Sequence, residues 1–383
     1  MLFFYNNFNN SNIMVFASSS NDEIEQELEE NINGILGDVD LSELDDFLVN
    51  DFELDFLNVN SFKELAVSVL NGNYFNEYNS LLDGVIKLLK NNIKNILSIT
   101  IMFLGIVLLY EMFNNFCIDK YADLKKSIRI IFSFFIVLLI ATLVKDVADS
   151  ISETINKIFN LAKTIFPILL SLVSLSGAVG TYSVYNSLSL FLINTCSYIF
   201  VYLLLPIAVA IMVLGLMGSI FSGKRFEKTI SIFKWVFKII IGVMFAVFGL
   251  FSMVNLVGVG TKDGVTIKLT KFAIKNYVPV LGGYISEGFD FLHACSVLVK
   301  NAVGVCGVVL LFVVVLKPLV LYVTYIFTFK ILALFVSYLG ADFYSDVFEN
   351  ASKSLGCLVT VLVGLFLIVF MFIYLLIFSV SVV

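Results

Sequence analysis

Long runs of apolar residues fill this chain from residue 96 onward, and they constrain its fold more than any other feature. An α-helix needs about 20 apolar residues to cross the roughly 30 Å hydrocarbon core of a bilayer. Only 14% of the residues are charged, about half of the usual fraction in soluble domains. The sequence therefore predicts an all-α, polytopic membrane helical bundle. The runs are Ile96–Phe113, Ile128–Val144, Ile165–Val179, Asn186–Phe221, Trp235–Val257, Val303–Ser337 and Leu355–Val382.

Two of these runs are too long for one upright crossing. Asn186–Phe221 has 36 residues interrupted by Pro206, and Val303–Ser337 is interrupted at Lys317-Pro318. At about 1.5 Å per residue, 36 helical residues reach roughly 54 Å. Each run is either one long kinked helix or two shorter helices, so the runs 186–221 and 303–338 cross once or twice. We expect seven to nine membrane segments, some of them kinked or re-entrant.

The N-terminal part is acidic. Residues 1–62 contain 14 Asp and Glu and no Lys or Arg, although the whole chain has a net charge of only -6. Residues 1–20 resemble a degenerate signal peptide that lacks the usual basic start. Residues 21–94 form an acidic, amphipathic region with apolar residues at helical spacing. Asp40 and Glu43 are placed as a helix start. The pattern fits a partner-binding segment and a solvated acidic segment equally well.

Basic residues in short loops predict the orientation, because such loops stay in the cytoplasm. The 114–129 loop has four Lys and Arg and the 222–238 loop has five, so both are expected in the cytoplasm. The 339–353 loop has three acidic residues and one lysine, which predicts the opposite side. The acidic region is then extracytoplasmic. The expected membrane helix groups are residues 95–260 and 303–383.

Residues 261–302, between these groups, are expected to form amphipathic interfacial or re-entrant helices. Lys268, Lys271 and Lys275 share one helical face, and Leu269 and Phe272 lie on another. The stretch from Asn276 through Pro279 to Gly283 contains proline and paired glycines, which are typical of a turn. A surface loop that packs on the bundle explains the same pattern as well.

Charged residues inside the apolar runs are the other candidates for function, because burying charge in lipid costs at least about 2.5 kcal/mol. Lys317 and Lys330 could line a polar path through the bundle. Alternatively they reach toward the membrane surface, and Lys317 beside Pro318 fits a short turn better than a path. The candidate polar path or interface comprises Lys268, Lys271, Lys275, Asn276, Pro279, Lys300, Asn301, Lys317 and Lys330.

Enzyme chemistry has little support in the residues, and we predict no catalytic, cofactor-binding or metal site. Gly218 to Lys224 resembles a phosphate-binding loop, but Arg225 stands where Ser or Thr should hold Mg²⁺. The chain has one histidine and five cysteines without metal-ligand spacing. His293 lies one helical turn after Asp290. We expect it to be an interfacial histidine with its hydrogen bonds satisfied, and we prefer this role to that of a proton relay. Scattered positive charges argue against a nucleic-acid partner.

Several residue patterns resemble the stage III sporulation protein AE family, over roughly residues 40–383. The more specific block lies between Asn276 and Gly307. The matching residues are Asp40-Leu-Ser-Glu-Leu44, Asn194-Thr195, Thr261-Lys-Asp-Gly264, Lys271-Phe272, Asn276-Tyr-Val-Pro-Val-Leu-Gly282, Ser296-Val-Leu298, Lys300-Asn301, Gly304, Gly307, Lys330 and Ser352-Lys353-Ser354.

This resemblance implies a multi-pass protein of the mother-cell membrane facing the engulfed forespore. The implied role is that of a subunit in a sporulation channel or secretion-like complex that connects the two cells. Implied partners are an ATPase, ring-forming membrane proteins of the same operon, a forespore-membrane protein and the lipid bilayer. The resemblance implies no catalytic residues. The residues also allow a stand-alone secondary transporter of small solutes or a structural membrane scaffold.

Overall fold

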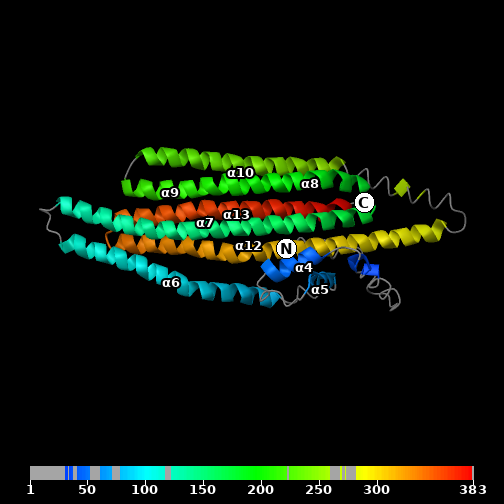
Figure 1. Ribbon diagram of the computed structural model, residues 1–383, viewed down its shortest axis with the longest axis horizontal. Helices are drawn as coiled ribbons and strands as arrows, with labels where there is room; N and C mark the ends of the chain where they lie inside the picture. Colours follow the sequence, from blue (N-terminus) through cyan, green and yellow to red (C-terminus); the bar gives the residue numbers. More distant parts are fainter. Residues whose placement is uncertain are drawn as a thin grey trace.

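The computed structural model describes residues 31–32, 34–37, 41–51, 61–70, 78–116, 122–221, 224–258, 268–269, 272 and 282–381. Within these residues the regular structure is helical, with six helices long and apolar enough to cross a membrane. The predicted all-α polytopic bundle is confirmed. The long helices lie side by side along the long axis of the molecule (Figure 1).

The bundle consists of five long helices and one composite helix. The composite helix begins as α8 (Val179–Ile199), passes through the π-helical turn η4 (Phe200–Leu204) and ends as α9 (Leu205–Phe221). The others are α6 (Tyr78–Phe116), α7 (Ala122–Leu175), α10 (Lys224–Gly258), α12 (Gly282–Tyr338) and α13 (Asp342–Ser381). With 54 and 57 residues, α7 and α12 are each more than 80 Å long at about 1.5 Å per residue. Both helices therefore exceed the thickness of a bilayer core.

The six described spans are fewer than the seven to nine that we expected from the sequence. The apolar runs 128–144 and 165–179 were expected to be separate segments, but α7 continues from Ala122 to Leu175 without a break. The residues between the runs are polar on one side only, so they continue the helix instead of forming a loop. Each overlong run also forms part of one helical unit without a reversal of the chain, and each of these units is a single candidate span.

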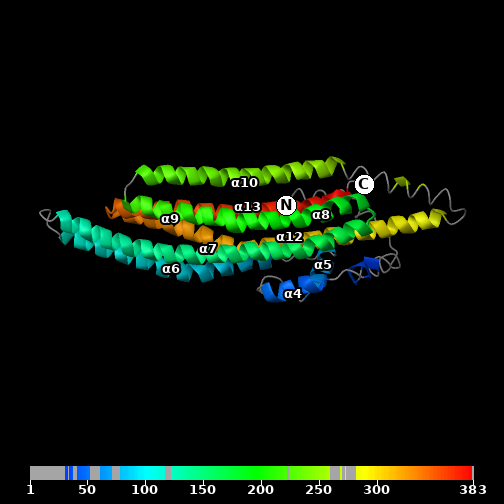
Figure 2. The ribbon, with the colours of Figure 1, turned by 45° about the horizontal axis from the view of Figure 1, so that its top comes forward.

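Pro206 lies within its run without reversing the chain. Proline lacks the N–H of an α-helical hydrogen bond, and its ring collides with the carbonyl four residues earlier. Here that carbonyl belongs to Tyr202, which lies within the π-helical turn η4. A π turn widens the helix locally, so the composite helix accommodates the proline and keeps its direction (Figure 2).

A turn at Lys317-Pro318 was the favoured prediction, and it is wrong. α12 contains Pro318 in its interior and continues for another 20 residues to Tyr338. Neighbouring helices support this stretch, since α13 and α7 both pack along α12. Tertiary packing therefore overrides the local breaking tendency of proline.

The end of α6, the start of α7, the end of α9, the start of α10 and the turn between α12 and α13 lie at the same end of the bundle (Figure 1). The Tyr344 hydroxyl at the start of α13 donates to the Arg129 carbonyl near the start of α7, over 3.1 Å. Asn350 Nδ2 donates to Ser219 Oγ near the end of α9, over 2.7 Å. The expectation that the 339–353 loop lies opposite the two basic loops is therefore wrong. Acidic residues contribute little to membrane orientation, so the acidic start of α13 was a poor guide.

The described part of the acidic N-terminal region packs on the bundle. α4 (Ser42–Asp51) contacts α7, and α5 (Phe62–Leu70) contacts α12. Leu44 and Leu65 are fully buried, and Asp45 Oδ1 accepts a hydrogen bond of 2.6 Å from the Phe62 amide. The bundle itself therefore covers the apolar side of α4 and α5. The predicted helix start at Asp40 and the signal-like residues 1–20 lie outside the described residues.

An aromatic cluster fixes the register of four helices. The ring of Phe372 in α13 lies 4.5 Å from Phe166 in α7, 6.1 Å from Tyr185 in α8 and 5.7 Å from Phe248 in α10, measured between centroids. These residues are at one level of the bundle. Positions elsewhere on α7 and α10 can therefore be compared by counting residues from Phe166 and Phe248.

Candidate functional site: a buried lysine and a polar helix face

Lys300 is the one fully buried charged side chain among the residues that the structure describes. It lies on α12, and its Nζ donates to the carbonyl oxygen of Ile377 over 2.7 Å. Ile377 lies just before the last turn of α13, where the helix dipole carries partial negative charge. The carbonyl and the dipole both favour an ammonium group at this place.

Two neighbours of Lys300 in the sequence have polar atoms with different surroundings. Asn301 Oδ1 is buried and has no hydrogen-bond partner within the described residues. His293 Nδ1 lies 2.7 Å from the Ser176 carbonyl oxygen at the end of α7, and since a carbonyl can only accept, the ring donates from this nitrogen. His293 is thus hydrogen-bonded and half-buried, as we expected of a satisfied histidine.

Glycines next to this site allow α12 to lie close to its neighbours. A Cβ at Gly304 would lie 2.6 Å from Ile377 Cδ1 and still closer to Ile377 Cγ1, and a Cβ at Gly307 would overlap Ile165 Cδ1 of α7. Small residues at helix interfaces are typical of membrane bundles because they let backbones approach. This close approach brings the Ile377 carbonyl within reach of Lys300.

The other predicted site residues do not join Lys300. Lys317 and Lys330 are both exposed on α12, and their separation of 13 residues turns them about 220° apart at 100° per residue. They therefore do not share one path. Lys268 is exposed, and Lys271, Lys275, Asn276 and Pro279 lie outside the described residues.

The sequence reasoning missed a polar face on α7, which we call the α7 polar face. Its residues fall within an arc of about 120° at 100° per residue, and the opposite side, including Val147, Ile151 and Ile158, is buried. From the first to the last of its residues the face is about 27 Å long. The α7 polar face comprises Lys145, Asp146, Asp149, Glu153, Asn156, Lys157, Asn160 and Lys163, all of them exposed except the half-buried Lys157.

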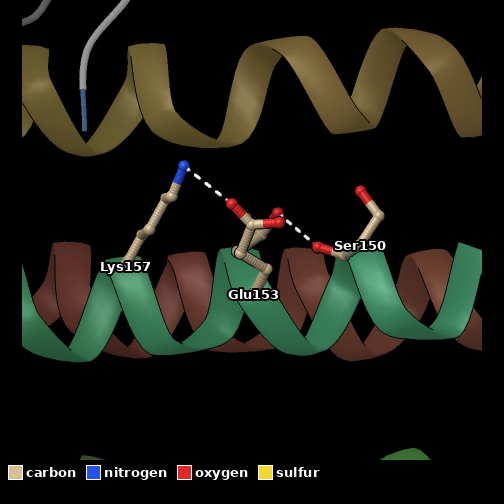
Figure 3. A network of polar contacts seen from close by, with 4 residues as sticks. Ser150, Glu153 and Lys157 are labelled. Atoms are coloured by element: carbon tan, nitrogen blue, oxygen red, sulfur yellow. Dashed lines mark hydrogen bonds and ion pairs between the residues drawn. The ribbon is translucent and has the colours of Figure 1, made fainter. Parts of the chain in front are cut away.

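Glu153 and Lys157 of this face form an ion pair of 3.0 Å (Figure 3). Beside the face, the buried Thr154 donates from Oγ1 to the Ser150 carbonyl over 2.8 Å, so both contacts stay on α7. The face was detectable in the sequence, because its charged and amide residues recur at helical spacing. The mean hydropathy of this segment is low, which is typical of a loop, and a mean value does not show that the polar residues share one face.

A small apolar cavity lies between the helices. It touches α7, α9, α12 and α13, and it is lined by Ile140, Leu143, Val144, Val147, Met212, Tyr325, Phe329 and Leu355. The charges at this level lie on the outside of the bundle, on the α7 polar face and at Lys330 and Lys353. The described residues thus do not form a charged path through the interior of one chain.

No cluster of three or more His, Cys, Asp or Glu suited to a metal ion occurs in the described part of the chain. The cysteines described there, Cys196, Cys295, Cys306 and Cys357, form no disulfide with one another.

Comparisons with known proteins agree with the resemblance seen in the sequence. Residues 60–380 match the family described as stage III sporulation protein AE. A curated relative, "Stage III sporulation protein AE" of Bacillus subtilis (strain 168), is 23% identical over 203 residues, which are 53% of this chain and 51% of the relative. The match thus spans about half the length of that relative. No solved structure matches this chain. Because the family match covers most of the 383 residues, this chain belongs to the stage III sporulation protein AE family of sporulation-related membrane proteins.

Proposed function

We propose that this protein is a non-enzymatic subunit of a channel or secretion-like complex that connects mother cell and forespore and is required for endospore development. The observation that carries the proposal is the family match over residues 60–380. In this proposal the protein lies in the mother-cell membrane facing the forespore. Its partners are an ATPase, ring-forming membrane proteins of the same operon and a forespore-membrane protein.

The packing favours a subunit over a stand-alone secondary transporter, the main alternative. Transporter sites are typically built from interrupted helices that meet near the bilayer midplane. Here α12 is continuous through Pro318 and the composite helix is continuous through Pro206. The small cavity between α7, α9, α12 and α13 is also lined by apolar side chains. A polar route at that level would therefore need a neighbouring molecule beside this chain.

A structural scaffold is the third candidate function, favoured by α4 and α5. These helices carry the exposed acidic residues Glu43, Asp46 and Glu64 on a rigid attachment to α7 and α12. Deleting residues 22–62 separates a scaffold from a channel subunit. A scaffold for an extracytoplasmic ring would lose ring assembly, whereas unaltered rings count against this role.

The test of the main proposal is purification of the full-length tagged protein from sporulating cells in mild detergent. We expect the operon partners to accompany it, and a deletion strain to lack mature spores. Recovery of the protein alone, together with solute uptake by liposomes that contain only this protein, would favour the transporter instead.

A further inference from the structure

The polarity of the outer surface differs sharply between α7 and the composite helix. The α7 polar face carries six charged residues and two asparagines over about 27 Å, close to the thickness of a bilayer core. The composite helix, which packs beside α7, exposes Tyr198, Tyr202, Leu203 and Val213 to between 42% and 67%. The α7 polar face is therefore suited to water, and the exposed surface of the composite helix is suited to lipid.

Two sets of contacts show that these surfaces share a level. Val147 of α7 and Met212 of α9 line the same cavity, so Val213 is level with the start of the α7 polar face. Phe166 and Phe248 both contact Phe372. Counting back five residues from each of them places Val243 of α10, which is 55% exposed, beside the level of Leu161.

Lipid is a poor neighbour for the α7 polar face. Each charged residue at the membrane centre costs at least about 2.5 kcal/mol, and only Lys157 and Glu153 within this face are joined by an ion pair. Acidic helices of the type found in soluble proteins also pack on these helices, α4 on α7 and α5 on α12. Part of the surface of α7 thus adjoins a segment suited to water.

We propose that the α7 polar face lines a water-filled vestibule within the depth of the membrane, open to the side on which α4 and α5 lie. The apolar surfaces of the composite helix and α10 face lipid at the same depth. The inference rests on the proposed channel role, since a neighbouring subunit would close the vestibule against lipid.

Thiol labelling of the full-length protein in intact membranes tests this inference. The variants Asn156→Cys and Asn160→Cys probe the face. Val243→Cys on α10 is the matched control, because it is level with Leu161 next to Asn160, and Val213→Cys on α9 is a second apolar control, level with the start of the face. All are made in a background with the native cysteines replaced by alanine. A membrane-impermeant maleimide is added from the outside, and a second sample is labelled after denaturation to show that each thiol is present.

We expect the two asparagine positions to react at least tenfold faster than the two valine positions. Lack of reaction at all four positions would overturn the inference, because the face would then be sealed from water. Equal reaction at all four would also overturn it, because this level of the bundle would then lie outside the membrane.

The labelling and the proposed function can fail separately. Labelling is measured both in sporulating cells and in an expression host that lacks the sporulation operon. A labelled face on a protein that purifies without partners keeps the vestibule and overturns the channel-complex role. An unlabelled face on a protein that purifies with its partners overturns the vestibule and keeps the channel-complex role.

Discussion

Lys300 shows how an unfavourable residue can be held in a bundle. Burying an ammonium group removes its hydration, and one carbonyl partner returns only part of that free energy. The contact with the Ile377 carbonyl, 2.7 Å long, and the nearby end of α13 reduce the cost without removing it. On stability alone, an apolar side chain of the same length would serve at least as well.

We therefore expect Lys300→Met to leave the thermal unfolding temperature of the solubilised full-length protein unchanged or raised. Methionine keeps most of the volume of the lysine stem and has no charge to dehydrate. Lys300→Ala should lower stability by about 2–5 kcal/mol, since it leaves a cavity in a packed interface. Thermal shift measurements in detergent compare the three proteins. If Lys300→Met is as unstable as Lys300→Ala, the ammonium–carbonyl contact is itself a net source of stability.

Gly304 of α12 packs closely against the branched side chain of Ile377 of α13. Gly304→Ala would place a methyl group inside the present position of the Ile377 side chain, so Ile377 must rotate or the helices must separate. We expect Gly304→Ala to lower the unfolding temperature and the added change Ile377→Ala to restore part of the loss. The coupling between the two sites should be about 0.5–3 kcal/mol. It is measured by a double-mutant cycle on unfolding in detergent.

Gly242→Ala in α10 is the matched control, because nothing lies within 4 Å of the added Cβ there. Alanine favours a helix over glycine by about 0.8–1 kcal/mol, so this variant should be neutral or slightly stabilised. If Gly304→Ala behaves like Gly242→Ala, the close approach of α12 to α13 does not limit stability.

The sequence predicts some of these helices better than others, because hydropathy indicates burial but not the face of a helix on which a residue lies. Continuous apolar runs report burial in lipid or core, and they located every long helix. The segment with Asp146, Asp149 and Glu153 lowers local hydropathy, so it read as a break although its charges occupy one face of α7. Burial of Lys300 could not be read from the sequence, because it depends on which face of α12 meets α13. Lys300 was a candidate because it belongs to the pattern that resembles the family, and not because of a chemical argument.

At the scale of the whole molecule, the ends of the helices define two poles. One pole contains the end of α6, the start of α7, the end of α9, the start of α10 and the α12–α13 turn with Gly340 (Figure 1). Lys125, Lys126 and Arg129 lie at this pole, and the excess of basic residues in short loops predicts that it is the cytoplasmic one. The α7–α8 turn, where Gly177 has a φ of 83°, lies at the other pole.

Single-cysteine variants of the full-length protein test this two-pole topology. Lys126→Cys and Tyr338→Cys lie at the basic pole, where Tyr338 is 89% exposed, and Val179→Cys lies at the other pole, where Val179 is 61% exposed. With an impermeant maleimide added to intact spheroplasts, we expect only Val179→Cys to be labelled. In inverted membrane vesicles the pattern should reverse, because the basic pole then faces the reagent. Labelling of Tyr338→Cys from the same side as Val179→Cys would contradict the shared end of α7 and α13, and with it the hydrogen bond between Tyr344 and Arg129.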